Sequence, residues 1–246
     1  MTELDYSASG VEVPGDIVDA HRALWSHIGS PGTWWTGTER VALAAEARAA
    51  DSCRLCGERK GALSPNAVQG KHDGPGTLPE AVVDTVHRIR TDPGRLSRDW
   101  FERLTGSGLD QAPYVELVGV VSLLTGVDYF ARSLGVDLLD LPKPRDGEPS
   151  RRLPESAKPG EAWVPMIAPE DASGPEADLY GEMTIVPNIM RALSLVPDEA
   201  RALQRSSNAH YLPAEQIPNP TVRKTLDRLQ IELVAARVSA LNECFY

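Results

Sequence analysis

The sequence predicts an all-α protein with two helical domains. Apolar residues recur at helical spacing through most of the 246 residues, and the alternating Val, Ile and Thr runs typical of strands are absent. A stretch dense in Pro, Gly and charge interrupts the helical pattern and predicts a linker over residues 143–175. We therefore expect an N-terminal domain at residues 16–142 and a C-terminal domain at residues 176–246.

Helices of the first domain are expected between clear breaking signals. Gly- and Pro-containing turns at residues 29–32, 61–79, 92–94 and 106–108 separate the helical patterns. Thr36 or Thr38 can cap the Ala-rich helix that leads into a pair of cysteines. The predicted helices cover residues 16–28, 39–60, 80–90, 97–105 and 114–134, and the last is apolar enough to lie at the centre of the domain.

Part of the linker should dock on a surface through Trp163 and Met166. The helices of the second domain are expected after it. Pro187 and Pro197 suit first-turn positions of two short helices, because the first turn does not need the missing N–H group. Residues 221–246 carry the longest uninterrupted helical pattern of the chain. The apolar face of this final helix lacks a closing helix, so the second domain should be poorly stable or depend on a partner surface.

Composition and charge exclude several classes of protein. A net charge of -10 argues against nucleic acid as a partner, because phosphate binding needs clustered Lys and Arg. The acidic, polar first residues do not form a signal peptide, and we expect no membrane span. Three cysteines make no disulfide framework and fit a reducing cytoplasm.

Two of these cysteines, Cys53 and Cys56, form the motif C-x-x-C at the end of the Ala-rich helix. A continuing helix would place both thiols on one face, where a disulfide needs only a modest local adjustment. Cations at Arg54, Arg59 and Lys60 would raise the thiolate fraction. The spacing therefore predicts a pair that cycles between dithiol and disulfide.

The same motif has two other interpretations. A zinc site needs two further ligands, and His72 is the best local candidate, but the sequence offers no clear fourth. The thiols could also be inert and buried. His87, like most histidines on a helix face, is more often an ordinary structural residue. We therefore expect no metal and no cofactor.

The end of the chain carries the segment RVSALNECFY at residues 237–246, with Glu232 twelve positions before Cys244. This pattern resembles the alkylhydroperoxidase D and carboxymuconolactone decarboxylase superfamily, especially its peroxidase-related members. Members of this family have a second cysteine three positions after the first, and then a histidine. Residues 115–121, 130–131 and 134–135 also look like the helix that closes a domain of this superfamily.

The resemblance implies two related helical domains of the alkylhydroperoxidase D type, with catalytic roles for Cys53, Cys56, Glu232 and Cys244. Two positions around the first pair depart from the family pattern, because Val41 and Lys60 stand where the family has its Glu and His. The resemblance thus extends to the two thiols but not to the Glu and His of the family's proton relay. Residues that could substitute through the fold are Glu39, Glu46, Glu116, His72 and His87, of which we select Glu116 and His87.

In this family the chemistry is that of a thiol peroxidase. A thiolate attacks the O–O bond of a hydroperoxide, becomes a sulfenic acid and is resolved to a disulfide by its partner. The implied partners are a hydroperoxide, a thiol or dithiol reductant and further copies of the chain. Cys56 is by analogy the attacking thiol. The alternatives are a non-catalytic helical scaffold and a decarboxylase-like enzyme of the same superfamily.

The last helical pattern runs to Tyr246 without a capping residue, one position before the family's second cysteine. One hypothesis is that the next codon is UGA, which is read in the cell as selenocysteine. A frameshift, a shortened chain or a degenerate domain would also explain the pattern. The nucleotides after the Tyr246 codon would distinguish these cases.

Overall fold

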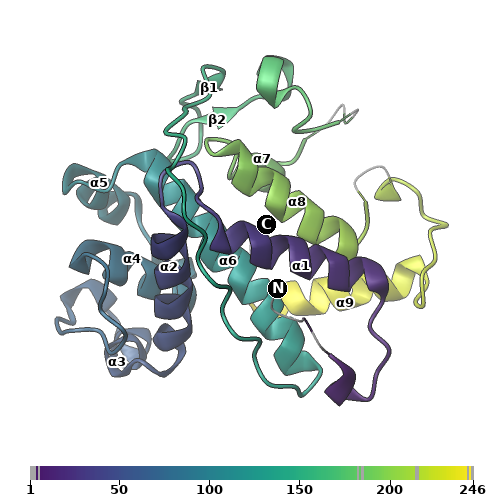
Figure 1. The fold of residues 1–246 in the computed structure, drawn as a ribbon, viewed down its shortest axis with the longest axis horizontal. Helices are drawn as coiled ribbons and strands as arrows, with labels where there is room; N and C mark the ends of the chain where they lie inside the picture. The colour runs from purple at the N-terminus through teal and green to yellow at the C-terminus, as the bar shows by residue number, and fades with distance from the viewer. Residues whose placement is uncertain are drawn as a thin grey trace.

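A computed structural model describes residues 4, 6–181, 183, 186–213, 216–242 and 244. Helices make up 56% of the chain, and a single small sheet of two strands accompanies them in the described part. The predicted all-α class is therefore confirmed (Figure 1).

Helices of the N-terminal region lie close to their predicted positions. Their bounds are α1 Gly15–Gly29, α2 Gly37–Ala49, α3 Arg54–Gly61, α4 Glu80–Thr91, α5 Arg98–Gly106 and α6 Gln111–Ser133. Short 3-10 turns lie at η1 Ser7–Ser9, η2 Ala50–Ser52, η3 Pro65–Ala67, η4 Pro93–Arg95, η5 Pro169–Asp171 and η6 Gly174–Glu176. Helix α2 begins at a capping box, in which Thr36 accepts from the Glu39 backbone and Glu39 accepts from the Thr36 backbone.

The helix that leads into the cysteine pair does not continue through it, as the sequence pattern had suggested. Helix α2 ends at Ala49, η2 follows, and Cys53 has an extended backbone with ψ of 124°. Cys53 is thus the N-cap of α3, and Cys56 lies in the first turn of that helix. Both thiols therefore sit at the positive end of a helix instead of a helix C-terminus.

Helix α6 crosses the middle of the molecule and supplies much of its core (Figure 1). Its buried residues include Leu117, Val120 and Leu124, which pack with Leu24 of α1 and Leu43 of α2. Contrary to the sequence expectation, α6 is long and apolar enough to cross a membrane by length and composition. However, 61% of its apolar window is buried inside the protein, as in the core helix of a soluble fold.

Residues 143–175 lie along the helices. The backbone N–H of Arg145 donates to the carbonyl of Gly29 at 2.7 Å, and that of Arg151 donates to Thr33 at 2.8 Å. Strands β1 Ala157–Lys158 and β2 Met166–Ile167 pair antiparallel. Trp163 packs against the main core, so the expectation that part of this segment docks on a surface is confirmed.

The C-terminal region contains α7 Asn188–Arg191, α8 Pro197–His210 and α9 Arg228–Leu241. Pro187 is the N-cap of α7, and Pro197 is the first residue of α8. The prediction of one helix from residue 221 is wrong at its start, because α9 begins after a capping box at Asp227. With 14 residues α9 is shorter than α6, which has 23.

Helix α8 lies beside α1 and also packs on α6 (Figure 1). Ala202 of α8 belongs to the core that α1, α2 and α6 build. A second apolar cluster joins Val115 of α6 to Leu195, Val196 and Ala200 near α8. The regions before and after the linker thus share cores, and the division into two related domains stays a prediction.

Candidate functional site

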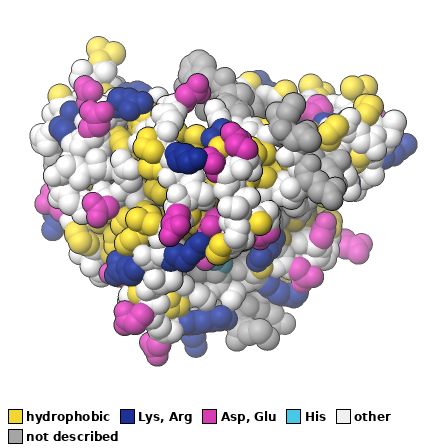
Figure 2. Space-filling view, turned by 90° about the horizontal axis from the view of Figure 1, so that it is seen from above, with side chains coloured by type: hydrophobic (Ala, Val, Ile, Leu, Met, Phe, Trp, Pro, Cys, Tyr) yellow, Lys and Arg dark blue, Asp and Glu magenta, His cyan; other side chains and the backbone are white. Residues whose placement is uncertain are grey.

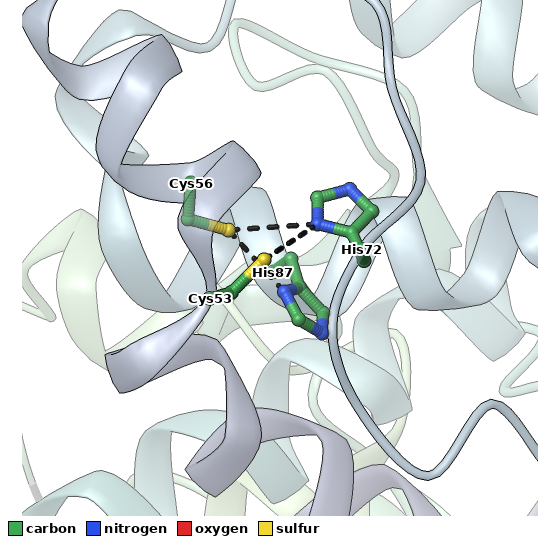
Figure 3. Close-up of side chains that lie close together, drawn as sticks. All are labelled: Cys53, Cys56, His72 and His87. Atoms are coloured by element: carbon green, nitrogen blue, oxygen red, sulfur yellow. Dashed lines mark hydrogen bonds between the residues drawn. The ribbon is translucent and has the colours of Figure 1, made fainter.

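Four side chains with metal-binding or redox chemistry meet between α3, the following loop and α4. The Sγ atoms of Cys53 and Cys56 lie 3.6 Å apart. His72 Nδ1 lies 3.5 Å from each sulfur, and His87 Nδ1 lies 3.2 Å from the sulfur of Cys56. Figure 3 shows the two sulfurs pointing toward the imidazoles, with His72 on the loop and His87 behind the cysteines.

The two histidines have the same orientation relative to the sulfurs. Each presents Nδ1 to the thiols and Nε2 to a carboxylate: Asp84 at 3.0 Å for His72 and Glu46 at 3.3 Å for His87. In a neutral ring, a carboxylate that accepts the Nε2 proton fixes the tautomer and leaves the Nδ1 lone pair directed at sulfur. Arg59 also donates to Asp84, at 2.5 Å, so two donors converge on that carboxylate oxygen.

Glu46 reaches the site from the buried face of α2. Its side chain is fully buried, and its Oε1 accepts a hydrogen bond from the backbone N–H of Gly76 at 2.6 Å. A Cβ atom at Gly74 would lie 2.5 Å from Glu46 Oε2, so the loop backbone approaches this carboxylate closely only because residue 74 is glycine. The loop therefore helps to hold Glu46 against His87.

The loop also contacts the start of α3. Asp73 accepts a hydrogen bond from the Arg54 backbone at 2.9 Å, and its own N–H donates to the Cys53 sulfur at 3.4 Å. The first contact gives the Arg54 N–H group at the helix start an acceptor, and the second gives the Cys53 sulfur a donor. The cysteines are thus held from both the helix and the loop.

The electrostatics of the cluster favour a thiolate beside an imidazolium. Burial opposes ionisation of Cys53, but N–H groups of Cys56 and Asp73 and the ring of His72 outweigh it and lower its pKa. Burial also opposes protonation of His72, but Asp84 and the two sulfurs raise its pKa to about 10. For His87, burial and the neighbouring His72 outweigh Glu46 and lower the pKa, which favours the neutral ring.

The two sulfurs are largely shielded from solvent, and one small pocket lies beside Cys56. Both sulfurs belong to buried residues, with Cys53 4% and Cys56 5% exposed. A pocket of about 10 Å³ borders Cys56, and its lining includes Arg59, Arg88 and Arg95. That volume holds roughly one water molecule.

The structure brings together part of the predicted set of site residues. His87, selected as a possible relay, contacts Cys56, and Glu46, named as a possible substitute, contacts His87. Glu39 forms the capping box of α2 with Thr36. Glu116 is in another cluster: its carboxylate accepts from Arg40 and from the Trp34 backbone.

This second cluster is a buried ionic network. Arg40 Nη1 lies 2.5 Å from Glu116 and 2.7 Å from Glu199, and His27 lies 2.8 Å from the same Glu199 oxygen. Burial raises the pKa of Glu116, whereas Arg40 and His27 overcome burial and lower the pKa of Glu199 to about 2. The network joins α1, α2, α6 and α8, so Glu116 has a structural partner instead of a thiol.

The residues that carry the family resemblance lie on and after α9. Glu232 accepts a hydrogen bond from Tyr211 and pairs with Arg228 at 2.6 Å. The side chain of Cys244 is exposed, and its backbone N–H donates to the Ser239 carbonyl. Glu243, Phe245 and Tyr246 lie outside the described residues. The catalytic roles implied for Glu232 and Cys244 stay predictions.

Sequence reasoning missed Asp84 and the contribution of His72 to both sulfurs. Asp84 could have been found from its position three residues before His87 on a strongly amphipathic helix, because residues three apart share a face. It accepts from His72, Arg59 and Arg88, the last at 2.8 Å. These partners outweigh burial and hold the pKa of Asp84 well below its usual range.

No protein-family model, curated protein or solved structure matches this chain. The residues alone therefore indicate what the site can do. Two thiols, two imidazoles and two carboxylates can exchange protons and electrons with a small oxidant, or hold a thiophilic metal ion.

Proposed function

We propose that Cys53 and Cys56 form a redox-active dithiol that reduces hydroperoxides. The observation that carries this proposal is the line of contacts from the Cys56 sulfur to His87 Nδ1 and from His87 Nε2 to Glu46. A nucleophile next to a base that a third group orients is the general arrangement of an activated nucleophile. Glu46 and His87 would supply the proton relay. They would replace the Glu and His of the family, at whose positions this chain has Val41 and Lys60.

Cys56 is the attacking thiol in this proposal. It contacts both imidazoles, whereas the ring contact of Cys53 is to His72. Cys56 also borders the small pocket described above. Because that pocket holds about one water molecule, hydrogen peroxide fits it better than a bulky organic hydroperoxide does.

The chemistry balances with one hydroperoxide and two thiols. His87 takes the Cys56 proton, the thiolate attacks one peroxide oxygen, and the O–O bond breaks to leave a sulfenic acid. His87 returns its proton to the departing oxygen, which leaves as an alcohol, or as water when the substrate is hydrogen peroxide. Cys53 then attacks the sulfenic sulfur and releases water, so the two sulfurs close from 3.6 Å to the roughly 2.05 Å of a disulfide.

An external thiol or dithiol must return the disulfide to the reduced state, because each turnover consumes two electrons. A reducing compartment such as the cytoplasm would supply it. The test is hydrogen peroxide consumption by the reduced protein, with a dithiol and a chelator present. Cys56→Ser should abolish consumption; equal rates in the wild type and Cys56→Ser would refute the proposal.

The non-catalytic scaffold remains a second candidate because of one feature of α9. Apolar side chains at Leu229, Leu233, Val234, Val238 and Leu241 are between 51% and 82% exposed along this helix. Their helical spacing forms a stripe that a second copy of the chain could cover in a symmetric pair. Sedimentation at micromolar concentration tests this candidate: a dimer that Leu233→Glu dissociates supports it, and a 26.7 kDa monomer excludes it.

A further inference from the structure

We propose that the reduced protein binds one Zn²⁺ ion through Cys53, Cys56, His72 and His87 in a closed, four-coordinate site. The proposal goes beyond the redox function and does not depend on it, because it requires the four side chains but no peroxide. Metal binding and peroxide reduction can therefore be tested separately.

Several distances between the donor atoms are close to those of a tetrahedral zinc site. Zn–S bonds of about 2.3 Å and Zn–N bonds of about 2.0–2.1 Å place ligand atoms about 3.3–3.8 Å from one another around a tetrahedron. The measured separations are 3.6 Å between the sulfurs, 3.5 Å from each sulfur to His72, and 3.2 Å from Cys56 to His87. All four donor atoms lie within 4.8 Å of one another.

The orientation of both histidines points to a metal more strongly than to a thiol alone. Zinc-bound histidines almost always direct one nitrogen to the metal and donate the other N–H to a carboxylate, a carbonyl or water. His72 does this with Asp84, and His87 does it with Glu46. A single base would suffice to activate one thiol, whereas here His72 contacts both sulfurs and His87 also contacts that of Cys56 (Figure 3).

The apolar packing around the four ligands is small, although hydrogen bonds such as those of Asp73 also hold this corner. The apolar cluster at this corner contains only Cys53, Leu55 and Cys56, with Val68 packed on it, among the described residues. Helix α3 has eight residues, fewer than a helix needs to be stable by itself. A zinc ion would connect α3, the loop at His72 and α4, and its binding free energy would stabilise this corner.

The donor set also selects the metal and its role. Two thiolates and two imidazoles suit zinc, whereas magnesium and calcium prefer oxygen ligands. Four protein ligands leave no position for a reactive water, so the site is structural and not hydrolytic. The four ligand atoms in this site are sulfur and nitrogen. On the outer face seen from above, the charged groups are instead interspersed acidic and basic side chains (Figure 2).

Zinc and a disulfide exclude each other at this site. Two zinc-bound thiolates, one hydrogen peroxide and two protons would give a disulfide, two waters and a released Zn²⁺ ion. Bound zinc should therefore slow oxidation of the thiols, and oxidation should release the metal.

The test is a titration of the reduced, metal-free protein with Co²⁺ and then Zn²⁺. We expect the visible absorption of tetrahedral cobalt with thiolate ligands, saturation at one ion per chain, and displacement by zinc. Cys56→Ser and His87→Asn should weaken zinc binding by roughly 100-fold or more, and Asp84→Asn by roughly 10–100-fold. His210→Asn, which changes an exposed histidine outside the cluster, should bind like the wild type.

Two results would overturn the proposal: no tetrahedral cobalt spectrum at one equivalent, or unchanged zinc affinity in a Cys53→Ser/Cys56→Ser double variant. Circular dichroism of each variant shows whether the helices persist. A protein that binds cobalt but consumes no peroxide in chelator refutes only the redox function. A protein that consumes peroxide but binds no cobalt refutes only the zinc site.

Discussion

The Nδ1 atom of His87 lies 3.2 Å from the sulfur of Cys56, although 31 positions separate the two residues in the chain. The opposite nitrogen of the ring faces Glu46, which is buried and comes from a third helix. This contact turns a short cysteine motif into a site with an oriented base.

Glu46→Gln should lower the rate of peroxide consumption by roughly 100-fold, because the amide no longer fixes the His87 tautomer that accepts the thiol proton. The measurement is the initial rate with chelator and excess dithiol. Glu102→Gln, an equal change on the exposed face of α5, serves as the control and should keep the wild-type rate. A rate within two-fold of wild type for Glu46→Gln, a margin of roughly 0.4 kcal/mol, would contradict the relay.

Gly74→Ala should also slow peroxide consumption, by roughly 10-fold, without replacing any group that reacts. The added Cβ would lie 2.5 Å from Glu46 Oε2 and would displace that carboxylate from His87. Gly94→Ala is the matched control, since no atom lies within 4 Å of its added Cβ. Equal rates for both variants would show that the loop does not position Glu46.

Arg40→Met should lower the free energy of unfolding by about 3–5 kcal/mol, because it leaves the buried carboxylates of Glu116 and Glu199 uncompensated. Urea denaturation at fixed pH measures this loss. Arg22→Met removes an exposed pair with Asp19 and should cost no more than about 1 kcal/mol. Equal losses for the two variants would mean that the buried network does not hold α8 to α2.

Lowering the pH from about 6.5 to about 4 should destabilise the protein through His21. Burial, and then the neighbouring His210, lower the pKa of His21 to about 4 from its ordinary 6.5. In this window the unfolded chain takes up a proton that the folded ring does not, so stability rises with pH and is lost as pH falls. The contribution reaches roughly 3 kcal/mol at most.

His21 is fully buried, and both of its ring nitrogens have neighbours. Its Nδ1 lies 2.6 Å from the hydroxyl of Tyr6, and its Nε2 lies 2.9 Å from Nε2 of His210. His21→Asn should flatten the dependence of unfolding free energy on pH between 4 and 6.5. An unchanged slope in urea titrations would assign that dependence to other groups.

The helices were predictable because their start and stop signals are local. The capping box at Thr36 and the breaks around α1, α4, α5 and α6 follow from residues within a few positions of each helix end. The break before Cys53 was not predictable, because the Ala-rich pattern continues and the contacts that hold the turn, such as Asp73 on Cys53, come from a distant loop.

The site was predictable only in part for a similar reason. The thiols are visible as a motif, and His87 and Glu46 were among the named substitutes, but choosing them over Glu116 requires knowing how α2, α4 and α6 pack. Glu116 points toward Arg40 instead of the thiols, which no local pattern reveals. Asp84 escaped notice because its partner His72 lies in an irregular loop.

The most direct test of the redox centre is to trap its first intermediate. In Cys53→Ser the resolving thiol is absent, so one equivalent of hydrogen peroxide in chelator should leave a sulfenic acid that a carbon nucleophile labels. Peptide mass spectrometry should find this label on Cys56, and adding His87→Asn should sharply slow its formation. A label confined to Cys244, or none at Cys56 while peroxide is consumed, would contradict the account.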